Sequence, residues 1–595
     1  QDAQKYNYNK NICYCKIIEV FWAVDMEFCY SKKDILRLYL SHAPFGGNVV
    51  GIDAAAWRYF NRNVSCLSWA ELCCLAVLPN SPALIHPGRN RMSLKHKRDG
   101  LLRSLHKAGV LTAEQFALSV DEPLPEKPYP IPNKTPHLLD YLSKNQQGKT
   151  VHTSIHMRLQ TLLQRLANDY CDKYRTSNHI ENIAILVLDV QSGMPIAYVG
   201  NTTDKCSEAW QVDVIQSERS PGSTLKPFLY AAMLSGGEIT PWRLISDTPL
   251  TINGFTPSNF SHSFSGAVHA DEAVVQSLNV PLVRMVSRHS PGRFMADLKW
   301  LGMSTLHYNE DHYGVSIILG GAEVKLWDLC GMYRNLAFRL LSSEHEEVDC
   351  RISKPAIWYT FLAMSKLNRP EEEAEWMHFR SMKNIAWKTG TSWGSRDAWS
   401  VGVNPKYVVG VWVGNATGEG RSGMTGVGFA SPVMFDVFAL LEDVPWFDMP
   451  KGMTPMVVCR KSGCLASDIC ALKDTVLLPS ACAHTENCHY CHLVHLSADG
   501  KWRVNASCEE VDAMQTKSWF SLPAAQEYYY KKHHADYYPL PPYRDDCLGF
   551  SDTPEFIYPT HNAVIIVPRG FDGTPEHVVF KAACKRSDAV LYWHL

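Results

Sequence analysis

Residues 219–227 read Arg-Ser-Pro-Gly-Ser-Thr-Leu-Lys-Pro, and an apolar run with helical spacing follows them. Pro221 and Gly222 predict a helix start, which places Ser223 at the N-terminus, where free backbone N–H groups favour a developing alkoxide. Lys226 projects from the same face one turn later, and a partly desolvated lysine accepts the proton of a serine. The Ser-x-x-Lys spacing alone is weak evidence, because an N-capped surface helix is the favoured explanation of these four residues by themselves.

Two later segments add chemical groups to this pair. Ser277-Leu278-Asn279 follows a helical pattern and offers a second hydroxyl and an amide, although a simple helix end is the plainer interpretation. Residues 385–394 alternate like a strand, which places Lys388 and Gly390 on one face. A strand glycine lets another backbone approach closely, so this segment suits an added peptide whose carboxylate is held by Lys388 and hydroxyls. An exposed strand with a turn is the alternative.

The segments around these motifs predict an α+β domain. Two hairpin signals lie far apart in the chain, at residues 183–199 and 398–413. Helical patterns at residues 225–234 and 324–340 lie between them. An antiparallel sheet of chain-distant hairpins around a helical insertion is an α+β design.

Length and proline content predict a multidomain chain. Its 595 residues correspond to about four domains, and 46% hydrophobic with 20% charged residues is ordinary globular usage. Six prolines between positions 123 and 136 predict a semi-rigid linker that holds no helix. The expected parts are a mostly α segment at 1–118, the linker at 119–138, the α+β domain at 139–445, a Cys-rich module at 446–550 and a β-like segment at 551–595.

Charge and hydropathy argue against a basic nucleic-acid-binding protein and against a membrane-spanning helix in this sequence. Lys and Arg number 58 against 60 Asp and Glu, a formal charge of −2, so no chain-wide basic field attracts nucleic acid. The most apolar early stretch, residues 12–29, contains four charged residues, whereas a membrane span needs about 20 mainly apolar residues. The chain starts at Gln1 without an initiator Met and stops inside a strand-like run, so we expect both ends to be truncated.

Ser-x-x-Lys, Ser-x-Asn and Lys-Thr-Gly follow one another here in the order found in penicillin-binding proteins and serine β-lactamases. The longer runs at 219–228 and 388–392 resemble class A penicillin-binding proteins, the bifunctional peptidoglycan synthases, and the C-terminal part resembles their 1C type. This resemblance implies that Ser223 is the acylated nucleophile and Lys226 its proton acceptor, with backbone N–H groups of Ser223 and Thr391 as the oxyanion hole. It further implies a second element of Ser277 and Asn279 and a substrate strand of Lys388, Thr389, Gly390 and Thr391.

Residues 1–118 resemble the later part of the family's other half, a lysozyme-like glycosyltransferase that polymerises lipid II. By this resemblance Lys16, Glu19 and Lys32 bind pyrophosphate and assist proton transfer, whereas the residues alone indicate only charges on a helix face. The family's Glu-Asp-x-x-Phe segment, which supplies the general base, does not occur here, nor does its Gly-Gly-Ser-Thr segment. Cys15 and Ser41 also replace the family's Arg and Asn. We therefore expect no glycosyltransferase activity from this chain, whatever its full-length parent does.

Eight of the 19 cysteines lie within 89 residues, which indicates either disulfides or a bound metal. Cys488-His489-Tyr490-Cys491-His492 offers zinc ligands, but the second tight cysteine pair of a zinc ribbon is missing. Because a cell-wall enzyme works where thiols oxidise, we expect disulfides and no metal. The cysteines concerned are Cys459, Cys464, Cys470, Cys482, Cys488, Cys491, Cys508 and Cys547. A tyrosine-rich run at 527–538 resembles the segment before the 1C-type C-terminal β-sandwich, which is expected to begin near Phe556 and to be incomplete.

The sequence therefore predicts a D,D-transpeptidase on the periplasmic face of the bacterial inner membrane. Expected partners are peptidoglycan stem peptides, β-lactams, cell-wall synthases and, for a full-length parent with its membrane anchor, lipid II. Transpeptidation by this route needs no cofactor, while the full-length glycosyltransferase could use a divalent metal.

Two alternatives stay open. One is a carboxypeptidase or β-lactamase-like hydrolase, although Ser-Leu-Asn in place of Ser-Asp-Asn argues against a class A β-lactamase. The other is a catalytically silent scaffold.

Overall fold

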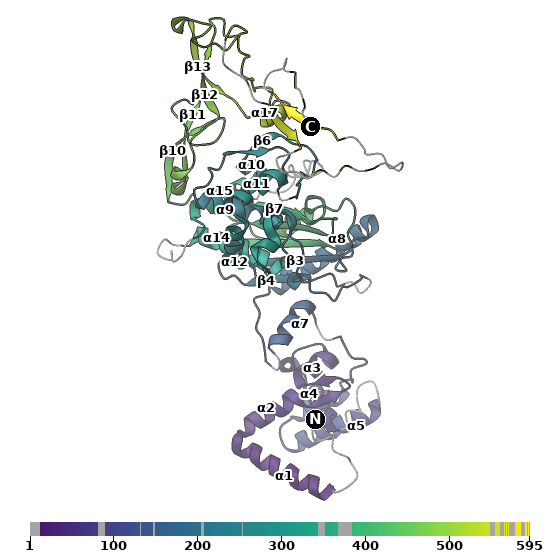
Figure 1. The fold of residues 1–595 in the computed structure, drawn as a ribbon. Coiled ribbons are helices and arrows are strands. Elements are labelled where there is room, and N and C mark those ends of the chain that lie inside the picture. Colours follow the sequence, from purple (N-terminus) through teal and green to yellow (C-terminus); the bar gives the residue numbers. More distant parts are fainter. Residues whose placement is uncertain are drawn as a thin grey trace. The chain divides into compact units, whose positions relative to one another are not determined.

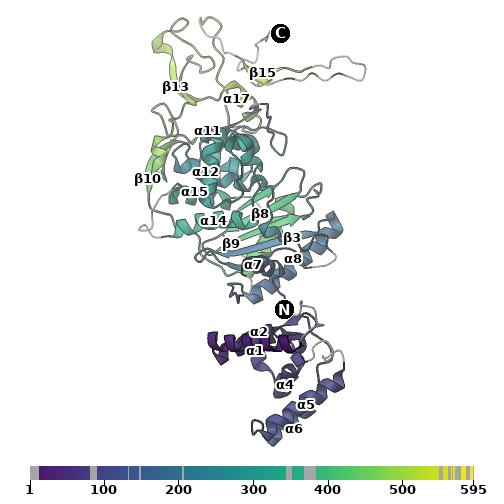
Figure 2. The same ribbon diagram turned by 60° about the horizontal axis from the view of Figure 1, so that its bottom comes forward.

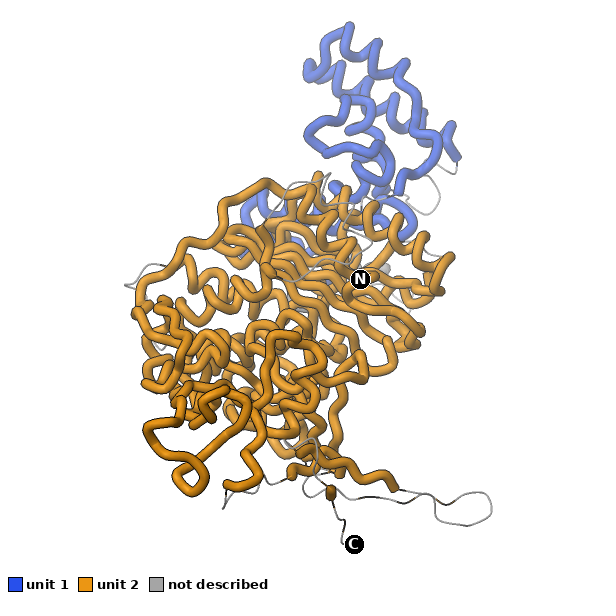
Figure 3. The backbone as a smooth tube through the Cα atoms, turned by 90° about the horizontal axis from the view of Figure 1, so that it is seen from above, with its two compact units in different colours: residues 1–133 blue, residues 134–595 orange. Residues whose placement is uncertain are grey.

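The computed structural model describes most of the chain. It forms two compact units, residues 1–133 and 134–595, which are coloured separately in Figure 3. Each unit has its own buried core. The described residues are 12–80, 90–130, 133–146, 149–203, 207–252, 254–342, 351–366, 384–547, 554–559, 565, 567, 569, 578–584, 590–591 and 593, without the side chains of 12–17 and 145.

The first unit is mainly helical, as predicted. A short antiparallel hairpin lies between the helices at Lys32–His42 and Ile52–Phe60, and a third helix follows at Trp69–Val77. Ser68 begins this third helix with a capping box, in which its hydroxyl accepts from the Glu71 N–H and the Glu71 carboxylate accepts from the Ser68 N–H. The elements are α1 (Ile12–Cys29), α2 (Lys32–His42), β1 (Pro44–Gly46), β2 (Val49–Val50), α3 (Ile52–Phe60), α4 (Trp69–Val77), α5 (Arg91–Lys107) and α6 (Ala113–Asp121).

The predicted linker is shorter than expected. Helix α6 ends at Asp121, and helix α7 (Pro136–Asn145) begins inside the expected range 119–138, with Pro136 in its first turn. Proline is tolerated there because the N–H it lacks would have no partner within the helix. The proline stretch at 123–136, which was expected to hold no helix, has neither helix nor strand in its described residues before Pro136, where α7 begins.

A five-stranded antiparallel sheet forms the centre of the second unit, in the order β4-β3-β9-β8-β7. Both predicted hairpins are confirmed, and they meet where β3 pairs with β9, with Leu186 opposite Gly410. The predicted Lys-Thr-Gly strand is β7, at one edge of this sheet. The strands are β3 (Asn182–Asp189), β4 (Pro195–Val199), β7 (Ala386–Thr391), β8 (Asp397–Val403) and β9 (Tyr407–Gly414).

Helices cover both faces of the sheet (Figure 1). Ile183, Ile185 and Val187 point to one face, where α8 (Met157–Asn178) and α16 (Ser431–Leu440) lie. Leu186 and Leu188 point to the other, where α9 (Lys226–Ser235), α14 (Leu326–Leu341) and α15 (Lys354–Ser365) lie. A sheet buried on both faces has nearly continuous apolar strands, which explains why β3 and β9 lack a polar alternation.

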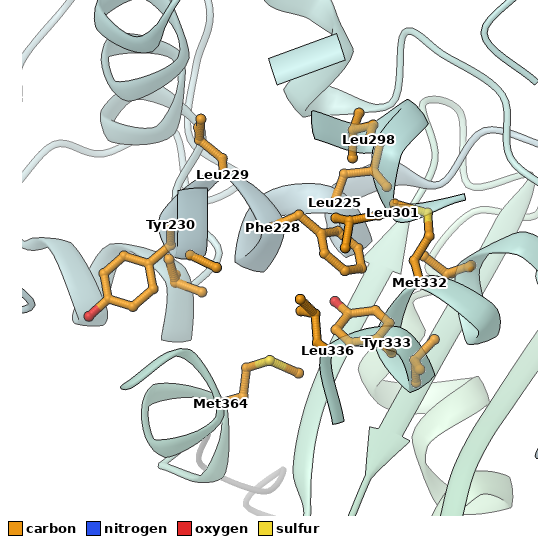
Figure 4. Packing of buried hydrophobic residues seen from close by; sticks show 14 of the residues in the cluster. Leu225, Phe228, Leu229, Tyr230, Leu298, Leu301, Met332, Tyr333, Leu336 and Met364 are labelled. Atoms are coloured by element: carbon orange, nitrogen blue, oxygen red, sulfur yellow. The ribbon is translucent and has the colours of Figure 1, made fainter. Parts of the chain in front are cut away.

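Helix α9 runs through the middle of the larger core (Figure 4). All its residues from Lys226 to Leu234 are buried, as expected of a helix that is apolar on every side. Phe228 stacks at a tilt on Tyr333, with ring centroids 4.5 Å apart, and the Tyr333 hydroxyl donates to Thr224 O at 2.7 Å. Full burial of Phe228 alone contributes about 2–3 kcal/mol to stability. The start of α9 is thus fixed rigidly in the core.

Several shorter elements complete this domain and lie between the two hairpins in the chain (Figure 2). The predicted helix at 324–340 is confirmed as α14. The remaining elements are β5 (Leu244–Asp247), β6 (Gly266–His269), α10 (Ala270–Val275), α11 (Asn279–His289), α12 (Pro291–Leu301) and α13 (Glu310–Tyr313). Strands β5 and β6 form a separate antiparallel pair.

The C-terminal part consists of small two-stranded sheets. The pairs are β10 (Met453–Cys459) with β11 (Lys473–Pro479), β12 (Cys491–Leu496) with β13 (Gln515–Phe520), and β14 (Glu555–Tyr558) with β15 (Lys581–Ala583), and α17 (Ala524–Tyr530) lies before the last pair. The predicted β-sandwich near Phe556 stays a prediction, because much of it falls outside the described residues. Among the described helices, none combines the length and apolarity that crossing a membrane requires.

Candidate active site

The turn that carries Ser223 is held between two parts of the domain. Residues Gly222–Leu225 form a 3-10 turn that continues directly into α9 at Lys226. Just before it, the backbones of Arg219 and Val324 exchange two hydrogen bonds of 3.0 and 2.8 Å. On the sheet side, the Trp399 indole N–H donates to Ser220 O at 2.8 Å. The predicted helix start at Ser223 is thus confirmed in position, with a tighter first turn than an α-helix.

Two glycines bring this turn against strand β7. Gly222 has a φ of 54°, and a Cβ on it would lie 2.5 Å from Thr391 O. A Cβ on Gly390 would overlap Pro221 O. Any other residue at either position would push the turn and the strand apart. The backbone that approaches Gly390 is therefore the chain's own Ser223 turn, a contact that the sequence alone did not assign to this glycine.

The Lys226 amine is completely buried beside this turn. Its Nζ donates to Ser277 O and to Asn279 Oδ1, both at 2.7 Å. A neutral amine has two N–H groups and one lone pair, so these two bonds leave the lone pair to accept a proton. No ion pair neutralises Lys226 anywhere in the described part of the chain, and burial lowers its pKa well below 10.5, helped by the charge of Lys388. Burial therefore favours the neutral form of Lys226, in which the amine can act as a base.

Ser277 joins the two buried lysines. Lys388 Nζ donates to Ser277 Oγ at 2.8 Å and to Thr389 O at 2.9 Å, while the Ser277 carbonyl accepts from Lys226. Burial lowers the pKa of Lys388 to about 7. Ser277 itself has a φ of 57°, a left-handed conformation that a non-glycine residue adopts only at a cost of about 1–3 kcal/mol. That strained backbone lets one serine present its hydroxyl to Lys388 and its carbonyl to Lys226.

Asn259 positions this second element and was not predicted from the sequence. Its Oδ1 accepts from the backbone N–H groups of Asn279 and Val280, at 3.0 and 3.1 Å, and so caps helix α11. Its Nδ2 donates to Asp247 Oδ1 at 2.8 Å. The cap comes from 20 residues earlier, whereas the usual signal is a polar residue directly before the helix, where Leu278 stands. No local pattern could have revealed it.

Strand β7 presents the remaining predicted residues at the sheet edge. Within the described chain it pairs only with β8, which leaves its other side for an added strand. Lys388 and Gly390 lie on the face toward the Ser223 turn and Ser277, and they share one face as the alternation predicted. Thr389 is buried, and Thr391 Oγ1 accepts from the Gly426 N–H at 3.0 Å. Ser223, Lys226, Ser277, Asn279 and the β7 residues thus come together in one place.

Two of the three charged residues predicted for glycosyl transfer have described side chains, and both are exposed. Glu19 is exposed on α1, and Lys32 is exposed at the start of α2, where it forms an ion pair with Glu27. Lys16 belongs to α1, but its side chain lies outside the described residues. Their assignment to pyrophosphate binding stays a prediction.

The predicted disulfides are present at one pair only. Cys508 and Cys547 form the single disulfide among the described residues. The other six predicted cysteines are free thiols in this structure, so the expectation of disulfides does not hold for them. For four of the six the reason is geometric, because Cys459, Cys470, Cys488 and Cys491 converge as a group rather than in bonded pairs.

Comparison with known proteins agrees with this arrangement. Residues 2–106 match the transglycosylase family, and residues 183–318 match the transpeptidase domain of penicillin-binding proteins. The chain is 32% identical over 464 residues to penicillin-binding protein 1C of Escherichia coli, covering 75% of this chain and 59% of that protein. It is 26% identical over 486 residues to penicillin-binding protein 1B of Vibrio cholerae, covering 74% and 61%. The chain thus spans about three fifths of the length of these relatives.

A solved structure shares the fold. Penicillin-binding protein 1A from Haemophilus influenzae superposes with a TM-score of 0.54 at 16% identity, covering 77% of this chain and 92% of that one. A helical transglycosylase segment, followed by a transpeptidase domain with a Ser-x-x-Lys turn against an edge strand, defines a penicillin-binding protein of two domains. The chain belongs to the class A penicillin-binding proteins.

Proposed function

We propose that this chain is a serine D,D-transpeptidase of peptidoglycan and that β-lactams acylate the same serine. The observation that carries the proposal is the buried Lys226 amine, held by Ser277 O and Asn279 Oδ1 beside the Ser223 turn. An isolated Ser-x-x-Lys on a surface helix would keep its lysine solvated and charged. Here burial leaves the amine a base within a rigid frame.

The reaction follows from these positions. Lys226 accepts the Ser223 hydroxyl proton while Oγ bonds to the penultimate D-Ala carbonyl carbon of a stem peptide. The backbone N–H groups of Ser223 and Thr391 stabilise the oxyanion, since the turn and the strand are in backbone contact there. The C–N bond then breaks, and D-Ala leaves with a proton passed through Ser277. An amine from a neighbouring stem attacks the ester, loses its proton to Lys226 and releases Ser223.

Lys388 and the edge of β7 form the substrate-binding half of this proposal. A stem peptide lying along β7 as an added strand would place its terminal carboxylate near Lys388, Thr389 and Thr391. A bound carboxylate would also favour the charged form of Lys388, whose burial otherwise lowers its pKa to about 7. Nucleophile, base and oxyanion donors all come from the chain, so the proposed transpeptidation requires no cofactor.

Two other activities compete with this proposal. If water resolves the acyl-enzyme, the chain is a carboxypeptidase or a β-lactamase-like hydrolase, and penicillin turns over instead of forming a lasting adduct. If the site is silent, the chain is a scaffold. Labelling with fluorescent penicillin, wild type beside Ser223→Ala, separates the three. The transpeptidase predicts a stable label that the variant lacks, the hydrolase a label that fades quickly, and the scaffold no label on either protein.

We further propose that these 595 residues do not polymerise lipid II. The family's Glu-Asp-x-x-Phe segment with the general base is not among them, and neither is its Gly-Gly-Ser-Thr segment. A full-length parent would be both a glycosyltransferase and a transpeptidase and would work on the periplasmic face of the inner membrane. Its glycosyltransferase could use a divalent metal. A polymerisation assay that yields glycan strands from this chain would contradict the proposal.

A further inference from the structure

Four cysteines of the C-terminal part bring their sulfur atoms together. The Sγ atoms of Cys459, Cys470, Cys488 and Cys491 all lie within 4.8 Å of one another, and each residue is at most 8% exposed. They lie in a small hydrophobic cluster with Tyr490, among others, separate from the Ser223 site. Free thiols scattered through a core for packing alone would not meet at one point.

The spacing within the group fits a tetrahedral metal better than a disulfide. Cys459 Sγ and Cys491 Sγ are 3.8 Å apart. Bonded sulfurs lie about 2.05 Å apart. Four thiolates around zinc at about 2.3 Å form a tetrahedron whose edge is about 3.8 Å. The observed separation therefore matches two ligands of one ion.

Three chain segments supply the four sulfurs. Cys459 ends strand β10 and is followed by a tight turn, in which the Gly463 N–H donates to Cys459 O at 2.8 Å. Cys470 follows before β11 begins. Cys488 and Cys491 form a Cys-x-x-Cys pair that ends where β12 starts, and the Cys488 N–H donates to Leu465 O at 2.7 Å. Backbone hydrogen bonds thus hold the Cys-x-x-Cys segment against the turn after Cys459.

Hydroxyl groups face two of the four sulfurs. Ser462 Oγ donates to Cys488 Sγ at 3.2 Å, and Ser467 Oγ lies 3.3 Å from Cys470 Sγ. Donors of this kind stabilise thiolates and orient metal ligands. Cys464 lies in the same cluster, but its thiol is directed to Ser462 O and it does not join the group. The set of ligands is therefore four thiolates with hydrogen-bonded support.

We propose that Cys459, Cys470, Cys488 and Cys491 bind one structural Zn²⁺ ion. Four thiolates fill the tetrahedral coordination of zinc and leave no open position for a substrate, which indicates a structural ion. On binding, the thiols release their protons to solvent and nothing is oxidised or reduced. Bound zinc also explains how these thiols survive outside the cytoplasm, because a coordinated thiolate is withheld from disulfide formation.

The position of the site gives the ion a role in the second unit. The turn between Cys459 and Cys464 contacts the transpeptidase domain where β5 begins, and the Leu244 N–H donates to Ser462 O at 2.8 Å. A Cβ on Gly463 would overlap Trp242 O, so the two backbones touch. Zinc would fix this turn, and with it the attachment of the Cys-rich module to the domain that contains Ser223.

The test is the metal content of the purified 595-residue chain, measured by elemental mass spectrometry. The proposal predicts about one zinc per chain in the wild type and a fall to about one tenth or less in Cys488→Ser. Cys482→Ser is the matched control, because Cys482 is also a buried free thiol but lies outside the group. The control should keep its zinc.

A second measurement on the wild type covers the case in which Cys488→Ser does not fold. Titration with a mercurial thiol reagent should release the zinc stoichiometrically, detected by a colorimetric chelator, and replacement by Co²⁺ should give the intense visible absorption of a tetrahedral thiolate site. Zinc-free wild-type protein with these four cysteines oxidised to two disulfides, seen as a lower intact mass before reduction, would overturn the proposal. Iron in place of zinc, or undiminished zinc in a folded Cys488→Ser variant, would also overturn it.

Discussion

Replacing Asn279 by Asp tests whether a neutral Lys226 is the base. The substitution keeps the shape of the side chain but places a carboxylate where Asn279 Oδ1 now accepts from Lys226 Nζ at 2.7 Å. An opposite charge at this distance holds a proton on the amine. Asn279→Asp should therefore turn Lys226 back into an ammonium ion and slow the acylation of Ser223.

The size of the effect follows from the distance. Unit charges 2.7 Å apart attract by about 6 kcal/mol at an effective dielectric constant of about 20. Desolvation of the new carboxylate offsets much of this, and a close opposite charge typically shifts a pKa by about 1–3 units. Each unit by which the pKa rises above the assay pH lowers the neutral fraction of Lys226 tenfold, so acylation at pH 7 should fall by at most about 10- to 1000-fold.

The assay is the second-order rate of penicillin acylation between pH 5 and 10, for wild type, Asn279→Asp and Asn404→Asp. Asn404 is the matched control, since its Oδ1 caps a hairpin turn by accepting from Lys406 N and Tyr407 N. In Asn279→Asp the acidic limb of the profile should move up by about 1–3 units, with activity recovering at high pH. An equal loss at every pH, or no loss, would refute a neutral Lys226 as the base.

Three further outcomes follow from the same contacts. Gly390→Ala should slow acylation at least about tenfold and lower the free energy of unfolding by about 1–3 kcal/mol, because its Cβ would overlap Pro221 O. Gly331→Ala is the control, since a Cβ there meets no other atom, and it should have neither effect. Asn259→Ala should lower the free energy of unfolding by about 2–3 kcal/mol, because it uncaps α11 and leaves buried polar groups unpaired. An unchanged denaturant unfolding curve would contradict this. The pKa of Lys388 is about 7 in the folded protein and 10.5 in the unfolded chain. Between these two pH values the unfolded state binds more protons than the folded state, so the free energy of unfolding should rise with pH. Lys388→Met should flatten that rise, and an equally steep slope in the variant would count against it.

Local patterns predicted the hairpins of the sheet and the strand that contains Lys388 and Gly390. The apolar runs at 183–199 and 398–413 carry hairpin turns, and such turns are local signals that survive in the fold. Alternation within β7 correctly placed Lys388 and Gly390 on one face, because the side-chain period of a strand is fixed. These features depend on neighbours in sequence, so sequence reveals them.

Features that depend on distant segments escaped prediction. Asn259 caps a helix that begins 20 residues later. Ser277, which has a left-handed φ, accepts hydrogen bonds from two lysines that are remote in sequence. The cysteine group joins three segments whose spacing matches no compact zinc motif, since Cys459 and Cys470 are separated by a turn. Each of these features depends on contacts between residues that lie far apart in the chain, so no short stretch of sequence contains both contacting residues.

The most direct test of the account is where penicillin becomes attached. Intact-mass spectrometry of the chain after incubation with benzylpenicillin, followed by peptide mapping, locates the covalent adduct. We expect one stable adduct per chain on the peptide that contains Ser223, and none in Ser223→Ala. No adduct, or an adduct at another residue, would contradict the assignment of Ser223 and Lys226 as nucleophile and base.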